Sequence, residues 1–125
     1  MKDKLENQGT GGVGRALGEF EQLVLLALVR LGEDAYGVTI KNEIEDQTGR
    51  EIFVGAVYTA LSRLQKQGYV SSIIGEPTAK RGGRRKKYYA LEPEGKAALG
   101  RSLETYRNMT RGIEEHLEAF VGRRS

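Results

Sequence analysis

The 125-residue chain has no cysteine, no tryptophan, one histidine and two prolines. Without cysteine it forms neither a disulfide framework nor a thiolate zinc site, and it has no cysteine nucleophile. The one histidine, His116, follows Glu114 and Glu115. Adjacent positions of a helix point in different directions and make a poor metal site. We therefore expect a protein that is not an enzyme and holds no metal.

Long apolar runs are missing as well. The longest, residues 23–31, is interrupted by Arg30 and is much shorter than the roughly 20 residues of a membrane-spanning helix. The first residues, MKDKLENQ, lack the apolar core of a signal peptide. We expect a cytoplasmic protein with no membrane contact.

Positive charge is concentrated in the middle of the chain. Residues 1–50 hold six basic and nine acidic residues, residues 51–91 hold eight and two, and residues 92–125 hold six of each. The three net charges are therefore −3, +6 and 0. A basic middle segment of this kind is typical of a nucleic-acid-binding surface.

Residues 1–17 are polar and rich in glycine, which predicts a flexible N-terminal arm. Within this arm, residues 9–14 read GTGGVG and match the G-x-G-x-x-G dinucleotide pattern. That pattern binds a cofactor only where it joins a buried strand to a helix, and no strand-like segment precedes it here. We expect no cofactor.

Three helices and two strands are predicted between residues 18 and 91. Apolar residues recur every three or four positions within residues 20–31, 36–44 and 57–64. Each segment is followed by a glycine that can end a helix: Gly32, Gly49 and Gly68. YVSSIIG and KKYYAL then have the composition of two strands joined by a long loop. This order predicts a mainly α (α+β) winged helix-turn-helix domain over residues 18–91.

The third helix is predicted to have one buried and one exposed face. At 100° per residue, Val57, Leu61 and Leu64 define the buried side. The opposite side carries small, hydroxyl and cationic residues and no acid: Gly55, Thr59, Ser62, Arg63 and Lys66. Such a face can enter the major groove of DNA. Tyr58 lies on the flank, either at the edge of the core or as a hydrogen-bond donor to phosphate.

The loop between the two strands carries six basic residues in positions 80–87. Clustered charge destabilises a compact fold unless a partner offsets it, and the Gly82–Gly83 pair lets the loop approach another molecule closely. Five cations are predicted to hold the DNA backbone or the minor groove: Arg81, Arg84, Arg85, Lys86 and Lys87. Four phosphate contacts from this loop give a salt slope of about −3.6 for log affinity.

Residues 92–125 are predicted to form one long helix that begins at Pro93. Its apolar positions follow an a/d heptad pattern: Leu99, Leu103, Tyr106, Thr110, Ile113, Leu117 and Phe120. A helix of about 28 residues extends about 42 Å, which is more than so small a domain can cover. Its flanking charges nearly cancel, whereas a helix on a membrane surface would be basic. We therefore expect this segment to form a homodimer.

Three segments carry a resemblance to a known family: LLALVRLGEDAYGVTI, VGAVYTALSRLQKQGYV and GGRRKKYYALEPEGKAAL. In order and spacing they resemble the PadR-like family of bacterial transcriptional regulators over about residues 18–100. The resemblance implies a winged-helix DNA-binding domain and a dimerising C-terminal helix, usually in a repressor that a small molecule relieves. The short tail resembles the compact branch of the family, with a single C-terminal helix.

The chain departs from the family pattern at two points. Leu91-Glu92 stands where the family often has Leu-Thr, whose threonine caps the last helix. Some compact members bind flat aromatic drugs between tryptophans at the dimer interface, and this chain has no tryptophan. Tyr106 and Phe120 are the aromatic residues of the heptad pattern, so the chemistry of a small-molecule effector stays open.

Two other functions remain open from the residues alone. A winged helix also serves as a protein-interaction module without specific DNA binding, which calls for a partner with an acidic surface. RNA binding is a third reading, but single-stranded RNA is usually read by aromatic residues on an open sheet, and only Tyr88 and Tyr89 qualify. For a homodimer on double-stranded DNA, two-fold symmetry predicts a palindromic operator with half-sites about 34 Å apart or a multiple of that distance.

Overall fold

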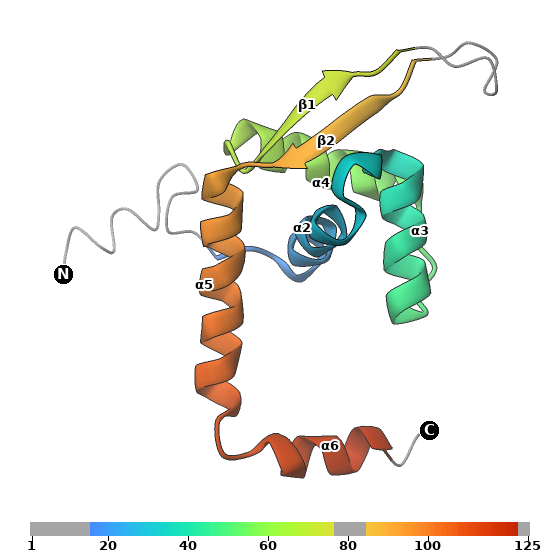
Figure 1. Cartoon of the computed structure of the whole chain (residues 1–125). Coiled ribbons are helices and arrows are strands. Elements are labelled where there is room, and N and C mark those ends of the chain that lie inside the picture. Colours follow the sequence, from blue (N-terminus) through green and yellow to red (C-terminus); the bar gives the residue numbers. More distant parts are fainter. Residues whose placement is uncertain (1–15, 77–84, 123–125) are drawn as a thin grey trace.

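The computed structural model describes residues 16–76 and 85–122 of the chain. In chain order its elements are α2 (Glu19–Leu31), the 3-10 turn η1 (Gly32–Asp34), α3 (Gly37–Thr48), α4 (Val54–Lys66), β1 (Val70–Ile74), β2 (Lys87–Leu91), α5 (Pro93–Thr110) and α6 (Glu114–Gly122). Three helices followed by a two-stranded antiparallel hairpin confirm the predicted winged helix-turn-helix fold (Figure 1).

The helices of the domain end within two residues of the glycines that the sequence predicts as their ends. At the start of α3, the Thr39 hydroxyl accepts a hydrogen bond from the Tyr36 N–H at 2.9 Å. At its end, Gly49 has φ 75° and its N–H donates to the Glu45 carbonyl. Because a side chain disfavours this left-handed conformation, glycine is the residue that ends α3 with least strain.

The core surrounds α2, which contacts α3, α4, β2 and α5. The largest side chains with almost no exposure are Val24, Leu25, Ile40, Val57, Leu61 and Leu64. Leu17 is also buried, although the sequence places it in the N-terminal arm. The rest of that arm, up to residue 15, lies outside the described residues. Val29, an apolar residue of α2, is 59% exposed.

The hairpin forms the wing, here defined as β1, β2 and the segment between them. Its strands pair antiparallel, from Val70 opposite Leu91 to Ile74 opposite Lys87. Tyr89 is buried, and its N–H donates to the Ala35 carbonyl at 2.9 Å. This hydrogen bond joins β2 to the turn between η1 and α3, so β2 is held against the helices.

The C-terminal segment is the main difference from the sequence prediction. α5 begins at Pro93, as predicted, and buries Ala98 and Leu99 in the core before it projects away from the domain (Figure 1). The prediction of one continuous helix is wrong, because α5 ends at Thr110 and α6 starts at Glu114 in a different direction (Figure 1). Within the described residues, no helix is both long and apolar enough to cross a membrane.

The break between α5 and α6 has a local cause. Gly112 takes φ 87°, a conformation that stops an α-helix and that glycine adopts readily. The Thr110 hydroxyl donates back to the Tyr106 carbonyl at 2.7 Å, and the Gly112 N–H donates to the Glu114 carboxylate at 3.0 Å. These bonds satisfy backbone groups at the break, so the heptad pattern continues in sequence while the helix does not.

Candidate nucleic-acid interface

Helix α4 presents one face to solvent. Val57, Leu61 and Leu64 each have 0% exposure and fix the helix against the core. The five residues that the sequence assigned to the opposite face are all exposed: Gly55, Thr59, Ser62, Arg63 and Lys66. The first turn of α4 has no acidic residue, and its last turn carries Arg63 and Lys66. The face thus offers donors and positive charge to a polyanion without a carboxylate to repel it.

At the start of this face, Gly55 leaves open space and Thr59 leaves a hydrogen-bond acceptor. A side chain at Gly55 would meet no atom within 4 Å, so its surroundings are open. The Thr59 hydroxyl donates to the Gly55 carbonyl at 3.0 Å, which leaves its oxygen free to accept a further hydrogen bond. This end of α4 can come close to another molecule.

Tyr58 lies at the edge of the core and is also 46% exposed. Its ring occupies the space beside Gly37, where any side chain would collide with the tyrosine hydroxyl and ring. Gly37 is therefore required for α3 and Tyr58 to pack together. The sequence offered a core-edge position and a phosphate contact as alternatives, and the position found is compatible with both.

A tyrosine–lysine cluster connects the loop-side end of the hairpin, at the start of β2, to the start of α3. The rings of Tyr36 and Tyr88 meet edge to face at 5.4 Å. The Lys86 ammonium lies 4.7 Å from the centre of the Tyr36 ring, and the Lys87 ammonium lies 5.9 Å from that of Tyr89. Such cation–π contacts hold the two lysine side chains in place. No local sequence pattern indicates this cluster, because Tyr36 is distant in sequence from Lys86 and Tyr88, which it contacts.

The other predicted wing cations divide into two groups. Arg85 is described and exposed, next to the two lysines at the start of β2. Arg81 and Arg84 lie outside the described residues. Arg85, Lys86 and Lys87 are therefore the part of the predicted basic loop that the structure places, and it places them at one end of the hairpin.

Tyr88 and Tyr89 do not form an open aromatic platform. Tyr89 is only 7% exposed, and Tyr88 is half-buried against Tyr36. Burial raises the pKa of the Tyr89 hydroxyl above its ordinary value, and the neighbouring Tyr58 adds to the rise. Since RNA bases stack on exposed rings, this arrangement does not favour single-stranded RNA.

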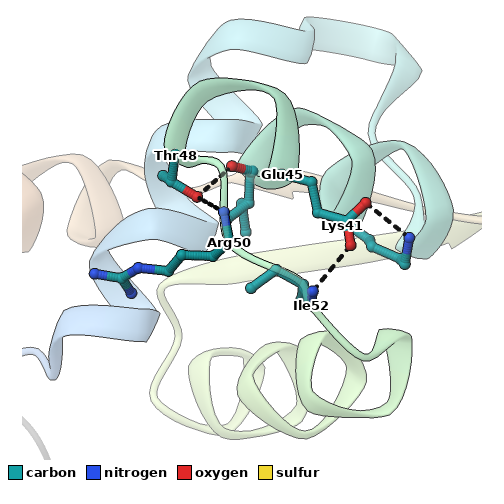
Figure 2. A network of polar contacts seen from close by, with 6 residues as sticks. Lys41, Glu45, Thr48, Arg50 and Ile52 are labelled. Atoms are coloured by element: carbon teal, nitrogen blue, oxygen red, sulfur yellow. Dashed lines mark hydrogen bonds and ion pairs between the residues drawn. The ribbon is translucent and has the colours of Figure 1, made fainter. Parts of the chain in front are cut away.

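The turn between α3 and α4 is fixed by polar contacts (Figure 2). One oxygen of the Glu45 carboxylate accepts from the Ile52 N–H at 2.9 Å, and the other lies 3.0 Å from the Lys41 ammonium. The Thr48 hydroxyl accepts from the Arg50 N–H at 3.1 Å. The Ile52 N–H, and then Lys41, hold the pKa of Glu45 below its ordinary value of 4.5. Glu45 therefore positions the segment that leads into α4.

Two ion pairs join α2 to the same region. Arg50 donates to Glu19 through its two terminal guanidinium nitrogens, at 3.2 and 2.8 Å, and Arg30 contacts Glu43 at 2.6 Å. The hydrogen bond from Arg50 holds the pKa of Glu19 below its ordinary value. Because these pairs are largely exposed, each stabilises the fold only modestly.

The predicted heptad residues are divided between the domain core and the two C-terminal helices. Leu99 is buried in the core of its own domain. The others extend along α5, the break and α6 and are exposed or half-buried: Leu103, Tyr106, Thr110, Ile113, Leu117 and Phe120. Met109 and Val121 are exposed as well. An apolar surface this large on projecting helices is typical of an interface.

His116 lies on this surface. Its ring meets that of Phe120 edge to face at 5.9 Å. No group of three histidine, cysteine, aspartate or glutamate side chains that could hold a metal ion occurs among the described residues.

The three-helix core and the wing define a protein of the winged-helix class, and α4 presents an exposed basic face. Residues 25–101 match the model of the transcriptional regulator PadR-like family, and the chain belongs to that family. Regulators of this family bind DNA and typically dimerise. No curated protein matches the chain significantly.

Solved structures of other regulators share the fold. A transcriptional regulator from Clostridium thermocellum is 29% identical, with 76% of this chain and 86% of that chain covered and a TM-score of 0.62. RosR of H. salinarum is 28% identical, with 87% and 94% covered and a TM-score of 0.61. A PadR family transcription regulator from Clostridium difficile, 24% identical, has 80% and 99% covered and a TM-score of 0.63.

Proposed function

We propose that this protein is a homodimeric repressor that binds a specific sequence of double-stranded DNA and is released by a small molecule. The observation that carries the proposal is the exposed face of α4, which combines small, hydroxyl and cationic residues and lacks a carboxylate. Helices of this kind read base edges in the major groove. Membership of the PadR-like family supports the same function.

In this proposal some residues of α4 contact base edges and others contact phosphates. Arg63 and Ser62 reach base edges, and an arginine can hold a guanine through two hydrogen bonds. Thr59 approaches the bases beside them, since Gly55 leaves that end of the helix open. Lys66 and Tyr58, nearer the flanks, contact phosphates, which fix the position of the protein on the duplex.

The wing supplies the sequence-independent part of the affinity. Lys86 and Lys87 lie over the rings of Tyr36 and Tyr89, so these cations are ordered before DNA binds and lose less entropy on binding. Arg85 extends the same basic end of the hairpin. Arg81 and Arg84 are included in this proposal because the sequence predicts them to contact DNA. These residues contact the backbone or the minor groove next to the site that α4 reads.

Homodimerisation is the part of the proposal that involves α5 and α6. Their exposed apolar side chains, such as Leu103 and Leu117, need a partner surface, and a second copy offers the same residues by two-fold symmetry. Such a dimer reads a palindromic operator with half-sites about 34 Å apart or a multiple. Repression and release by a ligand are proposed on the family resemblance.

The test measures the binding of labelled duplex DNA and of labelled single-stranded RNA by fluorescence anisotropy, at a series of rising salt concentrations. Duplex DNA should bind more tightly, with a log–log salt slope that becomes shallower by about 0.9 for each phosphate contact removed. In the variant Arg85→Ala/Lys87→Ala we expect a slope shallower by about 1.8 per protomer. Arg101→Ala/Arg107→Ala, which removes the same charge from exposed positions of α5, should keep the wild-type slope.

Three outcomes contradict the proposal in different ways. If the salt slope became equally shallow in the wing variant and the α5 variant, the wing would contribute only through the net charge of the protein and would not contact phosphates directly. Negligible affinity for duplex DNA at physiological salt would favour a protein-interaction module. Tighter binding of single-stranded RNA than of duplex DNA would favour an RNA-binding protein.

A further inference from the structure

Phe53 is the most exposed of the large apolar side chains that the structure describes, at 86%. It immediately precedes α4, with extended backbone angles of φ −85° and ψ 132°. An exposed apolar residue by itself is common on protein surfaces. The position of Phe53, at the end of the helix that faces DNA in the proposed function, is what makes this exposure informative.

The exposure of Phe53 follows from the way its turn is held. The preceding Ile52 packs partly against the core, and its N–H donates to the Glu45 carboxylate at 2.9 Å (Figure 2). Because successive side chains of an extended segment point to opposite sides, fixing Ile52 inward directs Phe53 outward. The aromatic ring is thus presented to solvent by an ordered turn.

The surroundings of Phe53 leave room for a ligand. Its carbonyl accepts a hydrogen bond from the Ala56 N–H at 3.0 Å, which joins it directly to the first turn of α4. That turn exposes Gly55 and Ala56, and a side chain at Gly55 would meet no atom within 4 Å. A ring beside two small residues can touch a flat surface that the helix end approaches.

The major groove presents one apolar group that distinguishes base pairs, the C5-methyl group of thymine. Contact with that methyl group is a known means by which phenylalanine reads a base. We propose that Phe53 is a specificity-determining residue that contacts the C5-methyl group of a thymine in each half of the operator. This inference rests on the proposed function, since it requires that α4 face duplex DNA.

The first test compares the DNA sequences that wild type and Phe53→Ala select from a random duplex library. Wild type should select a palindromic sequence with a strongly preferred thymine in each half-site. Phe53→Ala should select the same sequence without that preference, whereas Phe53→Leu, which keeps an apolar side chain, should retain much of it. An identical preference in wild type and Phe53→Ala would overturn the inference.

The second test replaces the preferred thymine with deoxyuridine, which lacks only the C5-methyl group. For wild type, loss of one buried methyl group should weaken binding about fourfold per half-site and about 15-fold for both. For Phe53→Ala, which should already bind more weakly, the replacement should change the affinity by less than about twofold. Equal sensitivity of the two proteins to deoxyuridine would overturn the inference.

Two controls separate this inference from the proposed function and from folding. If wild type selects no sequence at all, the proposed function fails; if it selects one in which Phe53 has no effect, only the inference fails. Thermal unfolding should be the same for wild type and Phe53→Ala, because an exposed side chain contributes little to stability. A marked fall in melting temperature would instead give the ring a role in the fold and contradict the inference.

Discussion

At the scale of single residues, two glycines at the candidate interface have opposite roles. Gly37 is needed because a side chain there would collide with Tyr58. Gly55 is not needed by the fold, since it lies inside α4 with open space around it. A glycine that costs helix stability without a packing reason suggests a functional one, and here we interpret it as close approach to DNA.

Gly55→Ala should therefore stabilise the protein and weaken DNA binding. Alanine lowers the conformational entropy of the unfolded chain, so the free energy of unfolding should rise by about 0.4–1 kcal/mol. The added methyl group should lower the affinity for the operator severalfold. Urea denaturation and anisotropy on the same samples measure the two effects.

Gly100→Ala is the matched control, because Gly100 is also an exposed helical glycine with open space around it, in α5. It should stabilise the protein similarly and leave DNA affinity unchanged. Equal affinity of Gly55→Ala and wild type for the operator would show that α4 does not approach DNA at this position.

At the scale of elements, the sequence predicts the helices and strands of the domain well and their connections less well. The periodicity of residues 57–64 was sufficient to orient α4, because apolar spacing directly reports the buried face. The heptad pattern did not predict the end of the helix near Gly112. Periodicity depends only on the spacing of apolar residues and does not show where the backbone turns between them. The tyrosine–lysine cluster and the Glu45–Ile52 contact depend on tertiary packing, which no local pattern encodes.

The polar turn between α3 and α4 makes stability depend on pH. The pKa of Glu45 is lower in the folded protein than its ordinary value of 4.5. Its charge therefore stabilises the fold above that value, and the contribution is lost as the pH falls through the folded pKa. Glu45→Gln should lower the melting temperature at pH 7, and this difference from wild type should shrink as the pH is lowered toward 3.

Asp46→Asn serves as a control for the removal of one negative charge from an exposed position of the same helix. Calorimetric scans of the three proteins between pH 3 and 7 provide the comparison. If the difference between wild type and Glu45→Gln stayed constant over this range, the ionised carboxylate would not be what holds the turn.

At the scale of the whole molecule, the domain and its C-terminal helices have different surfaces. The domain buries most of its apolar residues around α2, whereas α5 projects away from it and leads to α6 (Figure 1). This C-terminal segment exposes apolar residues, including Tyr106 in α5 and Ile113 in the break before α6. The sequence predicted that this segment needs a partner, and its exposed apolar residues are consistent with that prediction. The geometry with which two C-terminal segments would pair was not predictable from the sequence, because the break at Gly112 turns α6 away from the direction of α5.

Replacing an apolar residue of α6 should separate the proposed dimer. Leu117→Glu places a charge where a second copy would have to bury it, which is costly without a partner charge. Sedimentation equilibrium should change from about twice the 13.8 kDa monomer mass to the monomer mass itself. Ala119→Glu adds the same charge at another exposed position of α6 and should leave the dimer intact. Dimers of equal stability in both variants would place the interface elsewhere.

The central claim is that α4 reads DNA sequence, and Arg63 tests it most directly. The measurement is the ratio of affinities for the selected operator and for random duplex DNA, in wild type, Arg63→Ala and Lys66→Ala. Loss of a base contact costs about 1–3 kcal/mol, so Arg63→Ala should reduce this ratio about fivefold or more for each half-site. Lys66→Ala, a proposed phosphate contact, should weaken both complexes equally. If Arg63→Ala also weakened both complexes equally and left the ratio unchanged, α4 would not read the sequence, and the account would be contradicted.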